Sequence, residues 1–122
     1  MNDKTRPLDL TMIALSHPIR RVILDRLMRQ DLRVTELARP FRISLNAVSK
    51  HIFVLERAGL VRRRRIWREH LISVNPAPLD EALAWMEKSR TLWNARLDAL
   101  DALLKAEDLT VLAKSKKKGP RT

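Results

Sequence analysis

The 122-residue sequence contains no cysteine and only two glycines. Without cysteine, disulfide bonds, thiolate metal sites and cysteine nucleophiles are excluded. No glycine-rich loop is present to cradle a phosphate, and no Ser-His-Asp or paired-carboxylate pattern indicates an enzyme. A signal peptide and a run of about 18 apolar residues are also missing. We therefore expect a non-enzymatic, soluble, cytoplasmic protein that needs no cofactor and has no membrane partner.

Acidic residues are scarce in the middle of the chain, although the formal net charge of the whole is +11. Residues 33–68 contain ten Lys or Arg against two acidic residues, whereas residues 79–113 contain four against seven. Positive charge gathered in one region is typical of proteins that bind a polyanion, most often nucleic acid. The sequence thus predicts a basic binding region followed by an acidic segment with another task.

The segment 44–60 has the start and end signals of a short helix. Ser44 is a good N-cap, Gly59 supplies a left-handed residue after the last turn, and Leu60 is placed to fold back on Leu55. Apolar residues that predict a buried face recur at spacings of three and four: Leu45, Val48, Ile52 and Leu55. The other face carries Asn46, Ser49, Lys50 and Arg57. This polar mixture suits base edges and phosphates, and it also fits a solvated surface helix.

Three further helices are expected before Ser44. The first covers residues 8–15, and the second covers residues 18–29, with Ser16 as its N-cap. The third is brief; Thr35 caps it and Pro40 ends it. In the second helix the expected buried stripe is Ile19, Val22, Ile23, Leu27 and Met28. A short helix, a tight turn and an amphipathic helix together form a helix-turn-helix pattern.

After Gly59 the apolar period becomes that of strands. Residues 60–66 and 70–74 predict a β-hairpin with its tip at residues 67–69. Its first strand contains four consecutive arginines, residues 62–65, which must point alternately to opposite faces. We expect at least two of them to reach DNA and the others to pair with Glu56 or Glu69. An edge strand kept soluble by charge is the alternative interpretation.

The domain boundaries follow from these elements. We expect a flexible N-terminus at residues 1–7, a winged domain at 8–75, a long helix at 76–113 and a basic disordered tail at 114–122. The long helix carries an almost unbroken heptad stripe beside a second apolar stripe. One stripe is expected to pack on the winged domain and the other on a second copy of the chain, whereas an extended monomeric core is the alternative.

Three runs of residues resemble the ArsR-type winged helix-turn-helix regulators: Thr35-Glu36-Leu37-Ala38, residues 44–52 and residues 55–61. Residues 85–100, with Trp85, Trp93 and Arg96-Leu97-Asp98, resemble the cysteine-free branch, whose genes often lie beside genes for START-like ligand-binding proteins. The resemblance implies a mainly α fold with a small β-hairpin: four helices, the hairpin and a last helix. It also implies a dimeric repressor with its first and last helices at the dimer interface and the helix after Ser44 in the major groove.

The metal sites of the family do not carry over. Metal-sensing members use cysteines in the third helix, or histidine and acidic residues on the last helix. Here residues 36–41 contain no cysteine and residues 76–113 contain no histidine, so no metal is expected. His17, His51 and His70 are scattered along the sequence. We expect His17 to help cap the second helix and His51 to pack or form a hydrogen bond.

Two residues depart from the usual pattern of the family. Phe53 stands where a basic or polar residue is common, and Trp67 replaces the glycine of the wing tip. Loss of that glycine disfavours a tight turn, so a longer or differently bent tip is expected. Trp67 is expected either to pack over Phe53 or the arginine stems, or to contact the minor groove.

The sequence therefore predicts a homodimeric, sequence-specific transcriptional repressor that binds an inverted repeat in double-stranded DNA. The expected DNA-binding residues are Thr35, Arg42, Ser44, Asn46, Ala47, Ser49, Lys50, Arg62, Arg64, Arg65 and Arg68. The expected dimer-interface residues are Leu8, Met12, Leu83, Met86, Trp93, Leu97, Leu100 and Leu104. An effector would bind in the seam between the two last helices, and a partner protein is the other possible route of regulation. A non-specific or architectural nucleic-acid binder and a monomeric protein-interaction module are the alternative functions.

Overall fold

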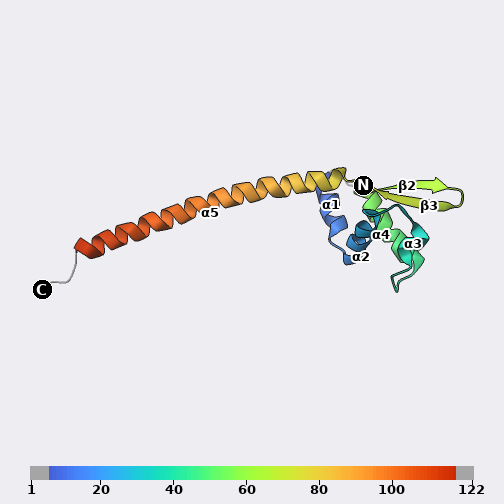
Figure 1. Cartoon of the computed structure of the whole chain (residues 1–122), viewed down its shortest axis with the longest axis horizontal. Helices are drawn as coiled ribbons and strands as arrows, with labels where there is room; N and C mark the ends of the chain where they lie inside the picture. The colour runs from blue at the N-terminus through green and yellow to red at the C-terminus, as the bar shows by residue number, and fades with distance from the viewer. Residues whose placement is uncertain (1–5, 118–122) are drawn as a thin grey trace. The chain divides into compact units, whose positions relative to one another are not determined.

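The computed structural model describes residues 6–117 and has the predicted mainly helical fold (Figure 1). The elements, in order, are α1 (Pro7–Leu15), α2 (Pro18–Leu27), β1 (Leu32–Arg33), α3 (Val34–Ala38), α4 (Leu45–Arg57), β2 (Val61–Ile66), β3 (Glu69–Val74) and α5 (Ala77–Lys117). A first compact unit ends at Ala84, and the second unit, from Trp85, contains the rest of α5. None of the helices within residues 6–117 is both long and apolar enough to cross a membrane.

Two of the predicted boundaries, at the end of α5 and at the N-terminus, differ from the structure. The helix continues to Lys117, beyond residue 113 where its end was expected, so the first residues of the predicted disordered tail are helical. The remainder of that tail, residues 118–122, lies outside the described residues. The same holds for residues 1–5 of the predicted flexible N-terminus, whereas Pro7 already belongs to α1.

The sheet has three antiparallel strands in the order β1-β3-β2. The hairpin of β2 and β3, which we call the wing, was predicted, whereas β1 was not. Leu32 of β1 lies opposite Ile72 of β3, and both side chains are buried. A strand of two residues is too short to show alternation, and it forms here because β3 offers a free edge to the segment that leads into α3.

The N-caps of α2 and α3 differ from the prediction. His17 caps α2, because its Nδ1 accepts the Ile19 N–H at 3.1 Å, while the Ser16 hydroxyl donates to the Ile13 carbonyl at the end of α1. The role expected for His17 is thus confirmed and that of Ser16 is wrong. Arg33 is the N-cap residue of α3, which places Thr35 inside the helix instead of at its cap.

Both ends of α4 are as predicted. The Ser44 hydroxyl accepts the Ala47 N–H at 3.1 Å. At the other end Gly59 has φ +74°, the Leu60 N–H donates to the Leu55 carbonyl at 3.0 Å, and the Gly59 N–H donates to the Glu56 carbonyl at 2.9 Å. These two bonds are the Schellman pattern, which ends the helix and turns the chain into β2.

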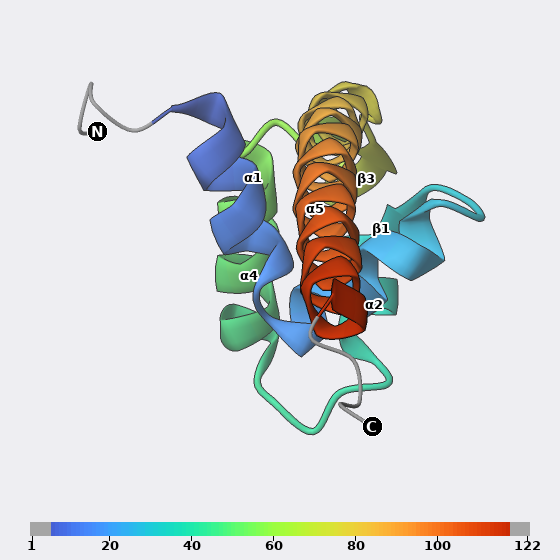
Figure 2. The ribbon, with the colours of Figure 1, turned by 90° about the vertical axis from the view of Figure 1, so that its left-hand side faces the viewer.

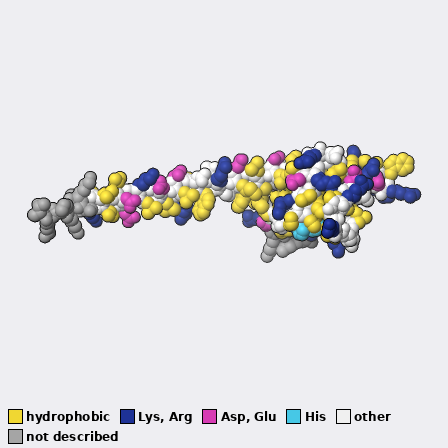
Figure 3. Space-filling model, turned by 60° about the horizontal axis from the view of Figure 1, so that its bottom comes forward, with side chains coloured by type: hydrophobic (Ala, Val, Ile, Leu, Met, Phe, Trp, Pro, Cys, Tyr) yellow, Lys and Arg dark blue, Asp and Glu magenta, His cyan; other side chains and the backbone are white. Residues whose placement is uncertain are grey.

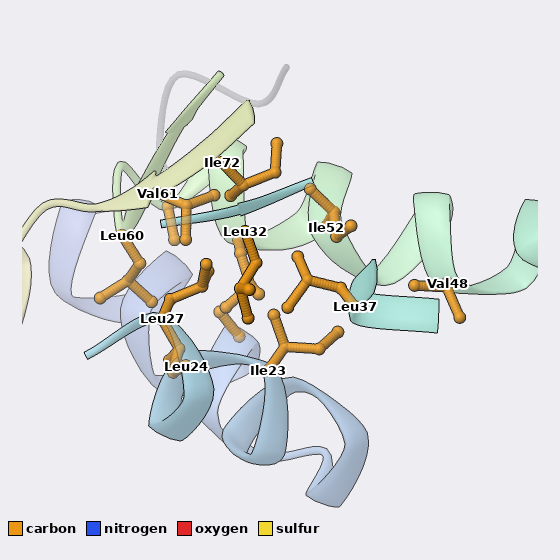
Figure 4. Packing of buried hydrophobic residues seen from close by; sticks show 13 residues of the cluster. Ile23, Leu24, Leu27, Leu32, Leu37, Val48, Ile52, Leu60, Val61 and Ile72 are labelled. Atoms are coloured by element: carbon orange, nitrogen blue, oxygen red, sulfur yellow. The ribbon is translucent and has the colours of Figure 1, made fainter. Parts of the chain in front are cut away.

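The core lies where α1, α2, α3 and α4 meet the sheet (Figure 4). Its labelled side chains are Ile23, Leu24, Leu27, Leu32, Leu37, Val48, Ile52, Leu60, Val61 and Ile72. In α2 the buried stripe includes Leu24, while Val22 and Met28, which were expected inside, are exposed. In α4 Leu45 is likewise exposed. The core therefore fixes the orientation of α4 through Val48, Ile52 and Leu55 and leaves its first turn free.

Candidate nucleic-acid interface

The outer face of α4 is available to a partner. Val48, Ile52 and Leu55 are fully buried on the inner face. On the outer face Asn46 and Lys50 are exposed, and Ala47 and Ser49 are half-buried. Since helix positions three or four apart lie on one side, Asn46, Lys50 and Phe53 form one exposed line along α4. Phe53, with 57% of its surface exposed, adds an apolar group to this line.

The four consecutive arginines of β2 divide between the two faces of the wing. Arg63 and Arg65 lie opposite Ile72 and His70, whereas Arg62 and Arg64 lie opposite Ser73 and Leu71. Because Ile72 is buried against the helices, the face of Arg62 and Arg64 is the outer one. All four arginines are exposed, as is Arg68 in the turn. Lys and Arg side chains gather over the wing, with hydrophobic side chains beside them (Figure 3).

One of these arginines is held by an acidic side chain of α4. Arg63 donates to Glu56 Oε1 from Nε at 3.1 Å and from Nη2 at 2.6 Å. The expected pairing of a wing arginine with Glu56 is thus confirmed. Glu69 pairs instead with Arg33, at 2.8 Å between Oε2 and Nε. The two ion pairs connect the wing to α4 and to β1. Among the described residues of the wing they leave four arginines without an ion-pair partner: Arg62, Arg64, Arg65 and Arg68.

A groove of about 240 Å³ lies between the wing, the start of α3 and the start of α4. It is lined by Arg33, Val34, Thr35, Leu45, Ser49, Arg63, Arg68, Glu69 and His70. Thr35, Ser49 and Arg68 were predicted as DNA-binding residues, and the fold brings them to one place. Arg33 and His70 were not predicted here. Arg33 reaches the groove through the pairing of β1 with β3, for which the sequence carries no strong signal.

A second cluster joins α1, α2 and α4 around Arg20. Its guanidinium donates to the Ala14 carbonyl at 2.8 Å and to the Ile13 carbonyl at 3.0 Å, and it lies 3.2 Å from His51 Nδ1. Since a guanidinium has no acceptor, His51 Nδ1 must accept in this contact. The rings of His17 and His51 stand 4.4 Å apart between centroids, so these histidines are not scattered in space as they are in the sequence. Hydrogen bonding and packing of His51, as expected, are confirmed.

The charge state of this cluster follows from its surroundings. Burial lowers the pKa of His51, and the neighbouring His17 and Arg20 lower it further. Burial also lowers the pKa of Arg20. His51 is therefore neutral at pH 7, as its accepting Nδ1 requires. The cluster attaches α4 to the end of α1, which lies beside it (Figure 2).

The wing tip is tighter than expected. Ile66 pairs with Glu69, so Trp67 and Arg68 alone form the turn. Trp67 has φ +59°, a left-handed conformation that costs a non-glycine residue about 1–2 kcal/mol. The Arg65 Nε donates to the Trp67 carbonyl at 3.0 Å and braces the turn. Of the two expected forms of the tip, the longer one is thus wrong. Packing of Trp67 on Phe53 or the arginine stems is also wrong, because 91% of Trp67 is exposed.

The apolar stripe of α5 is exposed in the single chain. Leu79 and Ala82 are covered within the first unit. The predicted interface residues of α5 are all exposed: Leu83, Met86, Trp93, Leu97, Leu100 and Leu104. Leu8 and Met12 of α1 are half-buried. The second unit also has a shallow apolar hollow, lined by Ser89, Arg90, Leu92, Trp93 and Arg96. In the part of the chain that the structure describes, no three His, Asp or Glu side chains gather closely enough to hold a metal ion.

Comparison with known proteins finds helix-turn-helix and ArsR-type transcriptional regulators. A family model described as a helix-turn-helix domain matches residues 15–64. The transcriptional repressor SdpR of Bacillus subtilis (strain 168) is 33% identical over 73 residues, which are 60% of this chain and 81% of SdpR. The crystal structure of an ArsR family transcriptional regulator superposes with a TM-score of 0.70 at 34% identity, over 73% of this chain and 98% of the other. An ArsR-like transcriptional regulator from Rhodococcus sp. RHA1 also has a TM-score of 0.70, at 30% identity, over 80% and 92% of the two chains.

Proposed function

Because this chain belongs to the ArsR family of winged helix-turn-helix transcriptional regulators, we propose that it represses transcription as a homodimer on an inverted-repeat operator. The observation that carries the proposal is the combination of an anchored α4, whose outer face is polar and open, with a wing that bears free arginines beside it. The first reads bases and the second binds phosphates.

Within α4 we assign base contacts to Asn46, Ala47, Ser49 and Lys50. Asn46 and Lys50 are exposed and lie one turn apart, at the spacing that reaches neighbouring base pairs in a major groove. The phosphate contacts are assigned to Thr35, Arg42, Ser44, Arg62, Arg64, Arg65 and Arg68. Arg63 is left out because Glu56 already holds its guanidinium. Arg65 keeps its Nη groups for a phosphate, while its Nε braces the wing turn.

The dimer is supported by the exposed stripe of α5. Six large apolar side chains of one heptad stripe, which Arg90 interrupts between Met86 and Trp93, are open to solvent in one chain: Leu83, Met86, Trp93, Leu97, Leu100 and Leu104. Such a stripe is buried when two helices pair as a coiled coil. We assign Leu8 and Met12 of α1 to the edge of the same interface. A two-fold dimer presents two α4 helices, which accounts for an inverted repeat in the operator.

The same fold permits a non-specific nucleic-acid binder that acts through charge alone, or a monomeric protein-interaction module. Neither requires the open polar face of α4. We assign no catalytic activity, metal or cofactor, and we place the protein with DNA in the cytoplasm.

The decisive experiment selects bound duplexes from a random library at about physiological salt, where binding through charge alone is partly suppressed. Metal is omitted and a chelator is present. Enrichment of an inverted repeat with half-sites about 10 base pairs apart supports the proposal. Retention of duplexes without an enriched sequence refutes it in favour of the non-specific binder.

The base contacts are tested by repeating the selection with Asn46→Ala. Loss of the Asn46 amide is expected to relax sequence preference at one position in each half-site, since a good bidentate contact discriminates by about 1–3 kcal/mol. Asn94→Ala is the matched control, because Asn94 is an exposed asparagine on α5 outside both apolar stripes. An unchanged preference for Asn46→Ala would show that other residues read the bases.

A further inference from the structure

The wing tip presents an apolar side chain in a place where the fold does not need one. Trp67 is the first residue of a two-residue turn and has φ +59°. Among the described residues it is the only non-glycine residue with a positive φ. Glycine adopts this conformation without a steric penalty, so the hairpin itself would favour glycine at this position.

The indole ring contributes little inside the chain. With 91% of its surface exposed, Trp67 is the most exposed of the large apolar residues that the structure describes. It does not cover the core and does not shield Phe53, which is itself exposed. A strained backbone that supports an unpacked aromatic ring indicates a use outside the chain.

The surroundings of the ring indicate what it contacts. Ile66, immediately before Trp67 in the sequence, is also exposed, so the tip carries a second apolar side chain. Arg65 and Arg68 flank these two residues in the sequence, and the Arg65 Nε donates to the Trp67 carbonyl. Apolar side chains between two cations match a DNA minor groove, where sugars and base edges lie between two rows of phosphates.

We propose that Trp67 enters the minor groove at the outer edge of each half-site and wedges against a base step there. This inference rests on the proposed function, because α4 in the major groove is what brings the wing to the flank of the site. Arg68 and the free Nη groups of Arg65 contact the phosphates on the two sides of the groove. A wedge prefers steps that unstack easily, so the operator flank is selected for flexible pyrimidine–purine steps although no base there is read by hydrogen bonds.

The first test compares wild type, Trp67→Gly and Trp67→Phe on the selected operator duplex. Trp67→Gly is expected to weaken binding about 5- to 150-fold, the range of one aromatic contact with a base. Trp67→Phe keeps an aromatic wedge and is expected to recover most of the affinity. Urea unfolding of the three proteins provides the folding control, and the Trp67→Gly midpoint is expected to be no lower than that of wild type. Equal operator affinity of wild type and Trp67→Gly would overturn the proposal.

The second test identifies the groove. Replacing adenine by 2,6-diaminopurine in the flank adds an amino group in the minor groove and leaves the major-groove edge unchanged. We expect this change to weaken binding by wild type and to have little effect on Trp67→Gly. Equal loss for both proteins, or no loss for either, would place the indole elsewhere and overturn the proposal.

The experiments distinguish failure of the Trp67 contact from failure of the proposed function. If the selection enriches no sequence, the proposed function fails, and the three proteins are then compared on a random duplex. If Trp67→Gly binds the random duplex more weakly than wild type does, the minor-groove contact of Trp67 is supported although there is no specific operator. Iodide quenching of wild type is compared with that of Trp67→Phe, which keeps Trp85 and Trp93, so that the difference reports the Trp67 indole. Protection of Trp67 by anionic phospholipid vesicles, without protection by duplex DNA, would assign the tip to a membrane surface and refute the minor-groove contact.

Discussion

Gly59→Ala is expected to destabilise the winged unit through the backbone alone. Gly59 has φ +74°, and a non-glycine residue in this conformation costs about 1–2 kcal/mol. A methyl group at Gly59 would lie 3.6 Å from Pro78 Cγ, an ordinary contact, so no steric clash is added. Alanine also reduces the entropy of the unfolded chain, which offsets about 0.4–1 kcal/mol. The expected net loss in the free energy of unfolding is about 1 kcal/mol.

The measurement is urea unfolding followed by circular dichroism at one fixed protein concentration, because stability depends on concentration in an oligomer. Gly59→Asn is the matched control. Asparagine is larger than alanine but tolerates the left-handed region, so it should lose less stability. If Gly59→Asn loses as much free energy of unfolding as Gly59→Ala or more, then the size of the side chain and not the backbone conformation sets the cost at Gly59, and the reasoning is refuted.

Three further predictions concern the charges and the apolar surface. Arg64→Ala should weaken binding to all duplexes about equally and reduce the slope of log affinity against log salt by about 1; a loss confined to one sequence would contradict a phosphate contact. Leu97→Glu should convert dimer to monomer in sedimentation without unfolding the chain, since Leu97 is exposed in the single chain, whereas Asn94→Glu should leave the dimer intact. The pKa of His51 is lowered in the folded state, so the unfolded chain binds the proton first and the free energy of unfolding should fall as the pH drops below about 6.5. His51→Gln should reduce the pH dependence of the free energy of unfolding between about pH 7.5 and 5.5. If that pH dependence were unchanged, groups other than His51 would be responsible for it.

Local signals predicted the ends of α4 well. The Ser44 cap and the Gly59 turn depend on residues that are neighbours in the sequence, and both were found as expected. The same local signals predicted the N-cap residues of α2 and α3 less well. Ser16 and Thr35 are good N-cap residues, yet His17 and Arg33 occupy those positions, because the tertiary packing sets where each helix begins.

Periodicity predicted which faces are apolar, but not which residue at an edge is covered. Leu24 is buried while Val22 and Leu45 are exposed, although all three belong to apolar stripes or lie beside them. A stripe on a helix is wider than the contact it makes, and the neighbouring element decides which side of the stripe is sealed. The same reason leaves Leu83 and Leu97 open in the single chain.

The sequence by itself determined the family, the element order from α1 to α5 apart from β1, and the residue types of the candidate interface, since these depend on spacing and composition. Tertiary structure alone decided which of the four wing arginines pairs with Glu56, that Arg33 reaches the groove, and that His17 meets His51. It also decided that Trp67 lies exposed in a two-residue turn at the wing tip, where the sequence favoured a longer or differently bent tip. Contacts between residues far apart in the chain, and the strain that a rigid hairpin can impose on one residue, arise only when the whole unit packs.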